Sequence, residues 1–144
     1  MHGEQQEVDR PHCFGLIDLD GALERVGGDE ELLCEAAQLF LDTCDESFTA
    51  VVDAAEAGDS EALTGAAHAL KGAVRSFGAE EAQEAALRLE MMGRNHQVED
   101  LRQPLVALRQ ALDRLRPVMG RLAHAFRDGM LVREVELTGC GVAR

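Results

Sequence analysis

Aromatic residues, lysine and positive charge in general are scarce in this sequence of 144 residues. Aromatic side chains make up 3% of the chain, with five Phe and neither Trp nor Tyr. The core must therefore be mainly aliphatic, which suits helices. The 27 acidic residues outnumber the 14 basic ones and give a formal net charge of −13. This balance argues against nucleic acid and against an anionic membrane surface as partners.

Paired cysteines and long apolar segments are also missing. The four cysteines, Cys13, Cys34, Cys44 and Cys140, form no C-x-x-C motif. Cys34 and Cys44 are expected on one helix about 15 Å apart, too far for a disulfide. No signal-peptide pattern opens the chain, and no stretch approaches the roughly 20 apolar residues of a membrane span. We therefore expect a soluble, cytoplasmic protein with reduced thiols and with Cys34 in its core.

Apolar residues that recur at three- and four-residue steps predict five helices. Their approximate ranges are 20–26, 29–57, 60–77, 79–92 and 98–126. Capping residues and glycines mark most of the boundaries. We expect Asp20 to cap the first helix, Asp29 and Gly58 to bound the second, Asp59 or Ser60 to begin the third, Gly78 to break it, and Gly93 to end the fourth.

Two helices show the clearest apolar faces. The predicted buried face of the second comprises Leu32, Leu33, Ala36, Leu39, Phe40, Thr43, Phe48, Val51 and Val52. In the fifth, the apolar positions are Leu101, Leu105, Leu108, Leu112, Leu115, Met119, Leu122 and Phe126, with unbroken 4-3-4-3 spacing. Pro104 suits a first turn, whereas Pro117 should kink the helix or end it.

The helices and their short connections predict one domain with an all-α fold. We expect an antiparallel, up-down-up-down four-helix bundle over residues 16–126, with the short first helix as a lid. Residues 1–15 show no periodicity and are expected to be a flexible lead-in. Residues 127–144 form a C-terminal tail, which is either strand-like, because residues 132–137 alternate in polarity, or disordered.

His68 lies on the polar side of the third helix, opposite its apolar stripe and beside Lys71 and Arg75. Gly65 and Gly72 stand about one turn on either side of it. Each glycine costs about 1 kcal/mol relative to alanine in a helix interior, and each removes bulk from around the imidazole. A histidine, two cations and cleared space on a helix surface indicate a site that receives phosphate.

Four short motifs occur in order along the chain. They are Gly27-Gly28-Asp29, His68-Ala69-Leu70-Lys71-Gly72, Gly78-Ala79 and Leu89-Glu90. Together they resemble the histidine-containing phosphotransfer (HPt) domain of two-component signalling, over roughly residues 18–116. The second motif alone would be weak, but all four in this order are specific. The resemblance implies a protein that relays phosphoryl groups, with a receiver domain, a sensor kinase or both as partners.

The resemblance also implies a role for each matching residue. His68 would be the phosphoacceptor, Lys71 would neutralise phosphate oxygens, and Gly72 would let a partner approach the imidazole. Glu90 would accept the Nδ1 proton, which fixes the tautomer and leaves Nε2 as the nucleophile. Arg75 would be a second cation or a docking residue. Lys71 is the only lysine in the chain, and a compact charge on a flexible stem suits a group that arrives and leaves.

The remaining chemistry is expected from partners. Gly27-Gly28 lacks the frame of a phosphate-binding loop, and no H-E-x-x-H motif or zinc-type cysteine pair occurs. We therefore expect a phosphocarrier without kinase activity, cofactor or metal of its own, and Mg²⁺ on the partner receiver domain. The predicted transfer runs between His68 and receiver aspartates, or from a sensor kinase to His68.

Two other interpretations stay open. The chain could be a non-transferring adaptor or inhibitor that binds a receiver or a kinase, although the complete set of histidine, lysine and glycine argues against this. It could also form a homodimer through its C-terminal segment, because residues 118–137 exceed what the bundle needs.

Overall fold

The computed structural model describes residues 16–125 and 129. The predicted lead-in at residues 1–15, Phe126, and the predicted tail apart from Gly129 lie outside the described residues. The strand-like alternation at 132–137, and with it most of the segment considered for dimerisation, therefore stays a prediction.

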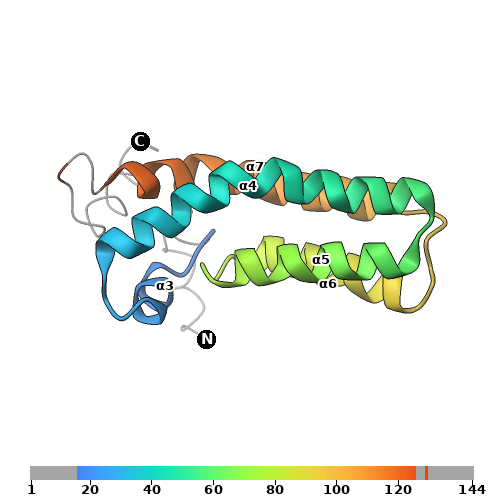
Figure 1. Ribbon diagram of the computed structural model, residues 1–144, viewed down its shortest axis with the longest axis horizontal. Coiled ribbons are helices and arrows are strands. Elements are labelled where there is room, and N and C mark those ends of the chain that lie inside the picture. The colour runs from blue at the N-terminus through green and yellow to red at the C-terminus, as the bar shows by residue number, and fades with distance from the viewer. Residues whose placement is uncertain (1–15, 126–128, 130–144) are drawn as a thin grey trace, which may run out of the picture.

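Five helices form the described part of the chain, which contains no strand. They are α3 (Leu19–Arg25), α4 (Glu30–Ala57), α5 (Ser60–Arg75), α6 (Glu80–Arg94) and α7 (Arg102–Ala125). Figure 1 shows that the four long helices run antiparallel, with α3 at one end. The packing is most extensive between α5 and α6 and between α4 and α7. The predicted four-helix bundle with a short N-terminal helix is confirmed.

Aspartate side chains begin three of the helices. Asp29 accepts a hydrogen bond from the Leu32 amide at 3.1 Å, and Asp59 accepts one from the Ala62 amide at 3.0 Å. The cap at Asp29 was predicted from the sequence, and Asp59 was one of the two residues, with Ser60, predicted to begin its helix. The predicted cap of the short helix, Asp20, is wrong: Asp18 is the cap, and Asp20 lies in the first turn.

The short helix α3 is tied to the end of α5, and this contact fixes where α3 begins. The amide of Asp18 donates to the carbonyl of Phe77 at 2.8 Å, and the Arg25 guanidinium donates to the carbonyl of Ser76 at 3.0 Å. Gly78 has a φ of 65°, and a Cβ there would lie 2.4 Å from the Cβ of Asp18. Gly78 therefore breaks α5 as predicted, and it also leaves room for α3.

The sequence predicted that Gly93 ends α6, and this prediction is wrong. Gly93 lies buried within that helix. A Cβ at Gly93 would lie 2.5 Å from Oγ1 of Thr64, 2.9 Å from the Thr64 backbone nitrogen and 3.0 Å from the Ser60 carbonyl oxygen. Two of these atoms belong to the backbone of α5 and cannot turn away. The glycine therefore lets α5 and α6 approach each other closely.

The buried face of α4 differs in part from its prediction. Leu32 and Leu39 are 44% and 62% exposed, and Thr43 is exposed too. The residues that α4 buries are Leu33, Cys34, Ala37, Phe40, Cys44, Val51 and Ala54. Small residues occupy much of the packed side, so leucine alone does not mark it. Cys34 is in the core as expected, and Cys44 is buried as well, which raises the pKa of its thiol.

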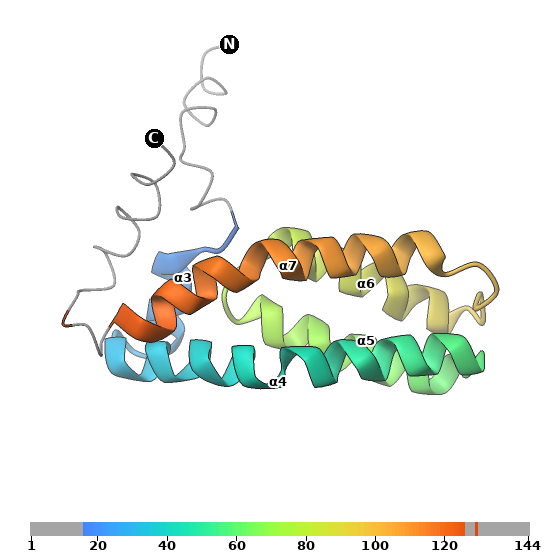
Figure 2. The ribbon, with the colours of Figure 1, turned by 90° about the horizontal axis from the view of Figure 1, so that it is seen from above.

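The face predicted for α7 is confirmed in most of its positions. Its buried leucines and methionine are Leu108, Leu112, Leu115, Met119 and Leu122. Pro104 lies in the first turn as predicted. Pro117 does not end the helix, which continues to Ala125. Pro117 and Asp113, whose carbonyl loses its partner because proline has no N–H, are both exposed residues. Figure 2 shows that the axis of α7 bends along its second half.

The close contact at Gly93 predicts opposite effects for two alanine substitutions. Gly93→Ala should destabilise the protein by about 1–3 kcal/mol, the usual cost of overpacking. Gly120→Ala, on α7, is the matched control, because a Cβ there meets no atom of the described residues within 4 Å. It should stabilise the helix by about 0.5–1 kcal/mol. Urea unfolding followed by circular dichroism measures the unfolding free energies of both variants. If Gly93→Ala were as stable as Gly120→Ala, this account of Gly93 would be contradicted.

Candidate functional site

His68 projects from the exposed side of α5, with 63% of its side chain accessible. The opposite side of this helix carries its buried residues, Leu63, Ala67, Leu70 and Val74. The sequence pattern placed His68 opposite this stripe, and the structure has it there. The imidazole is therefore available to a partner, while its helix is fixed by the core.

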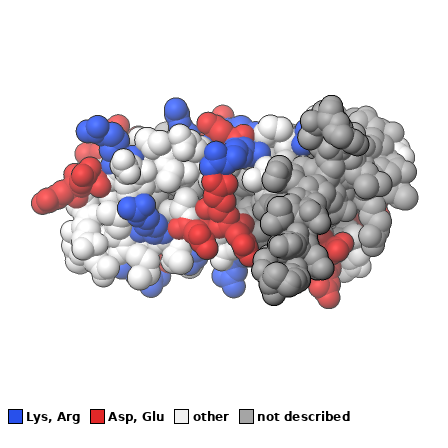
Figure 3. Space-filling model, turned by 180° about the vertical axis from the view of Figure 1, so that it is seen from behind, with Lys and Arg blue, Asp and Glu red and all other residues white. Residues whose placement is uncertain are grey.

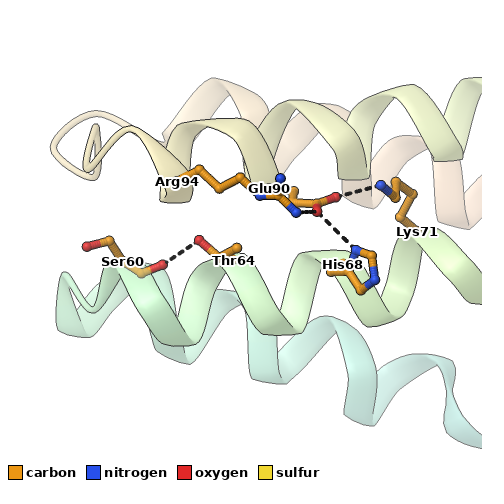
Figure 4. A network of polar contacts seen from close by, with 6 residues as sticks. All are labelled: Ser60, Thr64, His68, Lys71, Glu90 and Arg94. Atoms are coloured by element: carbon orange, nitrogen blue, oxygen red, sulfur yellow. Dashed lines mark hydrogen bonds and ion pairs between the residues drawn. The ribbon is translucent and has the colours of Figure 1, made fainter.

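Glu90 is the one polar or charged residue that is buried within the described part of the chain. It lies on α6 and faces α5, and only 2% of its side chain is exposed. Figure 4 shows its carboxylate between the side chains of His68, Lys71 and Arg94. The carboxylate therefore lies beneath these polar side chains, close enough to the surface to contact the exposed imidazole.

The two oxygens of Glu90 have different partners. Oε1 lies 2.8 Å from Nζ of Lys71. Oε2 lies 3.0 Å from Nδ1 of His68 and accepts a hydrogen bond from Nη2 of Arg94 at 2.6 Å. His68 and Lys71 come from α5, whereas Arg94 lies one turn after Glu90 on α6. The carboxylate of Glu90 thus contacts two side chains of α5 and one side chain of its own helix.

The charges around Glu90 keep its carboxylate ionised. Burial by itself raises the pKa of this group, because water no longer solvates the negative charge. The close contact with the Lys71 ammonium group, the hydrogen bond with His68 and the positive charges of Lys71 and Arg94 outweigh burial, so the pKa of Glu90 is held below its usual value. The carboxylate is therefore a hydrogen-bond acceptor at neutral pH.

An ionised carboxylate beside Nδ1 determines the role of each ring nitrogen. Because Oε2 of Glu90 can only accept, Nδ1 of a neutral His68 must carry the proton. Nε2 then keeps its lone pair. The arrangement gives a nucleophilic nitrogen whose ring is held in place by the neighbouring helix.

Open space surrounds both glycines that flank the histidine. A Cβ at Gly65 or at Gly72 would meet no atom within 4 Å, and both residues are exposed. Neither glycine lies at a turn, and neither makes room for another described residue. Each therefore lowers helix stability with no gain in packing against the described part of the chain, which fits a surface that another molecule approaches.

A surface hollow continues from Gly65 toward the start of α5. It is lined by residues of α5 and by the end of α6, including Ser60, Thr64, Gly65, Arg94 and His96. The Oγ of Ser60 and the Nδ1 of His96 share a hydrogen bond of 2.9 Å. His96 is thus tied to the first turn of α5.

The two predicted cations are in different situations. Lys71 is 16% exposed at its side chain and forms its ion pair with Glu90. Arg75 is exposed in the last turn of α5, and its side chain makes no hydrogen bond or ion pair with another described residue. The structure thus brings Lys71 and Glu90 to His68, whereas Arg75 stands apart on the surface.

Arg94 is the site residue that the sequence analysis missed. Its signal was present, because Glu90 and Arg94 have the i, i+4 spacing of a helical ion pair. Such pairs are common on exposed helix surfaces and seldom mark a site. Only the burial of Glu90, which depends on the packing of α5 against α6, makes this pair important.

Other kinds of site find no support within the described ranges. No group of three or more His, Cys, Asp or Glu residues is arranged to hold a metal ion there. None of the helices described has the length and apolar character needed to cross a bilayer. On the face drawn in Figure 3, basic side chains are scattered among acidic ones and form no continuous basic surface where the surface is coloured.

Comparison with known protein families identifies the family of this chain. The family described as "Hpt domain" matches residues 35–118, which include His68, Lys71, Gly72 and Glu90. Searches of curated proteins and of solved structures found no significant match.

The depressed pKa of Glu90 predicts a specific acid sensitivity. Its ion pairs stabilise the fold above the unfolded-state pKa of about 4.3, and this contribution is lost as the pH falls through the lower folded-state pKa. Glu90→Gln should remove that component of the pH dependence. It should also lower the unfolding free energy at neutral pH by about 1.5–3 kcal/mol, the range for hydrogen bonds to charged groups.

Glu84→Gln is the control, because Glu84 is an exposed acid on the same helix. Urea unfolding at a series of pH values measures both variants. If Glu90→Gln and the wild type lost stability in parallel as the pH falls, the ion pairs would not stabilise the fold.

Proposed function

The chain belongs to the Hpt family, whose domain carries phosphoryl groups on histidine in phosphorelays, and we propose that His68 is the residue that accepts and passes on the phosphoryl group. One observation carries this assignment. His68 is exposed, and its Nδ1 lies 3.0 Å from the buried, ionised carboxylate of Glu90. An exposed histidine with its proton held on the inner nitrogen presents the outer nitrogen to a partner.

The chemistry follows from this tautomer. The Nε2 lone pair attacks phosphorus, an N–P bond forms, and the bond from phosphorus to the donor's carboxylate oxygen breaks with its electrons going to that oxygen. The proton stays on Nδ1, so the ring becomes positively charged as the bond forms. The carboxylate of Glu90 stabilises this charge, as an acidic partner does for a catalytic histidine. The reverse sequence returns the phosphoryl group to a carboxylate.

Lys71 and Gly72 support the transfer in different ways. The ammonium group of Lys71 is held beside the imidazole by Glu90 and neutralises phosphoryl oxygens as they arrive. Gly72 keeps the surface clear for the partner, in agreement with the open space above it. Gly65 does the same on the other side of the histidine, and Arg75 is available for docking.

The partners follow from the same chemistry. We assign them as a receiver domain with a phosphorylatable aspartate, or a sensor kinase that phosphorylates His68. The receiver supplies Mg²⁺ and the acidic pocket, and this chain needs neither nucleotide nor metal of its own. Such partners place the protein in the cytoplasm, as its cysteine content also suggests.

The assignment of His68 is tested by substitution. His68→Gln should abolish acid-labile labelling by a phosphorylated receiver, because glutamine has no nucleophilic ring nitrogen. The fold should survive, since the side chain is largely exposed. Labelling with radioactive phosphate measures the transfer, and circular dichroism checks the helices.

His124→Gln is the matched control, because His124 is an exposed histidine on α7, and it should be labelled like the wild type. Undiminished labelling of His68→Gln would rule out this site. Receiver binding without any labelling of the wild type would instead favour the adaptor or inhibitor interpretation.

The open space over Gly72 makes a second prediction. Gly72→Ala should stabilise the protein by about 0.5–1 kcal/mol, because alanine is the better helix former and no atom is in its way. The same methyl group should slow transfer from the receiver by hindering its approach. Gly120→Ala should give a similar gain in stability with normal transfer. A Gly72→Ala variant that transfers at the wild-type rate would show that this glycine does not serve access.

A further inference from the structure

Arg94 contacts the oxygen of Glu90 that also faces the histidine. Its Nη2 lies 2.6 Å from Oε2, and the same oxygen lies 3.0 Å from Nδ1 of His68. Lys71 takes the other oxygen, Oε1, at 2.8 Å. The two cations therefore have separate places on one carboxylate, and only Arg94 shares the oxygen that holds the imidazole.

Transfer to His68 gives Lys71 a second anion to bind. If Lys71 neutralises phosphoryl oxygens, as in the function proposed above, its ammonium group is drawn away from Oε1. Glu90 is almost fully buried, so without Lys71 its charge is balanced only by Arg94 and the phosphorylated ring, while the phosphoryl group adds negative charge nearby. If Arg94 were missing as well, these changes would favour uptake of a proton by Glu90, and a protonated Glu90 no longer offers the charge that stabilises the ring.

We propose that Arg94 is a positioning residue that keeps the Glu90 carboxylate ionised and in contact with Nδ1 of His68 when Lys71 turns to the phosphoryl group. The part of this inference that concerns Lys71 rests on the proposed function. The part that concerns Arg94 and Glu90 rests on the contacts of the unphosphorylated protein.

The position of Arg94 suits it to stay while Lys71 moves. It lies four residues after Glu90 on the same helix, so the two keep their distance when α5 or a partner shifts. Its guanidinium is always charged and spreads that charge over a planar fork. The side chain is 58% exposed, so its other N–H groups remain in water at no cost. Lys71, by contrast, comes from α5 and has a flexible stem.

The state without the Lys71 contact can be imitated in the unphosphorylated protein. Lys71→Gln removes its charge, so Arg94 alone should keep Glu90 ionised and the His68 proton on Nδ1. Lys71→Gln combined with Arg94→Gln should shift the titration of Glu90 upward and lose the preference for the Nδ1-protonated tautomer. Lys71→Gln combined with Arg88→Gln is the matched control. Arg88 is exposed on α6, and two residues before Glu90 it lies on the other side of the helix.

Two NMR measurements read these states. Nitrogen-15 shifts of the His68 ring report the tautomer, and carbon-13 shifts of the Glu90 carboxyl report its titration. The groups that face Glu90 are His68 and Lys71 from α5 and Arg94 from α6, and the variants separate the last two. The same tautomer ratio and the same Glu90 titration in the two double variants would overturn the proposal.

A third measurement covers the case in which the double variant does not fold. Arg94→Gln alone should slow transfer from a phosphorylated receiver about tenfold, which corresponds to about 1.4 kcal/mol. Arg94→Lys should restore most of the rate, and Arg88→Gln should leave it unchanged. An Arg94→Gln variant as fast as the wild type would contradict the proposal.

The two proposals fail in different ways. The NMR measurements use neither partner nor phosphate, so an altered tautomer in the Arg94 double variant supports the positioning role on its own. A wild-type protein that is never labelled at His68 would refute the proposed function, whatever the tautomer.

Discussion

The site depends on one unusual constraint, which is a carboxylate buried between two helices. Removing a charge from water is costly unless cations and hydrogen-bond donors replace the solvent. The bundle meets this cost with Lys71 from one helix, Arg94 from the other, and the Nδ1 proton of His68. The groups that make the burial of Glu90 tolerable are also those that set up the imidazole. Stability and chemistry therefore rest on the same contacts.

Glycine serves two opposite purposes on the neighbouring faces of α5 and α6. At Gly93 the missing side chain lets the two helices approach within a distance that no Cβ would allow. At Gly65 and Gly72 the missing side chains leave space outside the molecule. The first brings Glu90 within reach of the histidine, and the others leave the same histidine accessible. Glycine thus permits both the close packing of the two helices and the open surface around the histidine.

Sequence patterns predicted the features that depend on neighbouring residues and missed those that depend on packing. The cap at Asp29 is a local hydrogen bond, and the polar position of His68 follows from helix geometry. Gly93 was predicted as a helix end, because a glycine that permits close packing looks the same in sequence as one that ends a helix. Glu90 was placed beside the histidine only through the family resemblance. Arg94 was missed because its spacing from Glu90 is typical of an ordinary surface pair.

The short helix α3 supplies hydrogen-bond donors to the end of the helix that carries His68. The last carbonyls of a helix lack intrahelical partners, and α3 supplies donors for two of those that follow α5, at Ser76 and Phe77. These donors come from Asp18 and Arg25, whereas the family match begins at residue 35. The contacts that satisfy the end of α5 therefore extend beyond the family match. A protein trimmed to the matched residues would lose the donors for these two carbonyls, which would leave the end of the helix that carries His68 open to fraying.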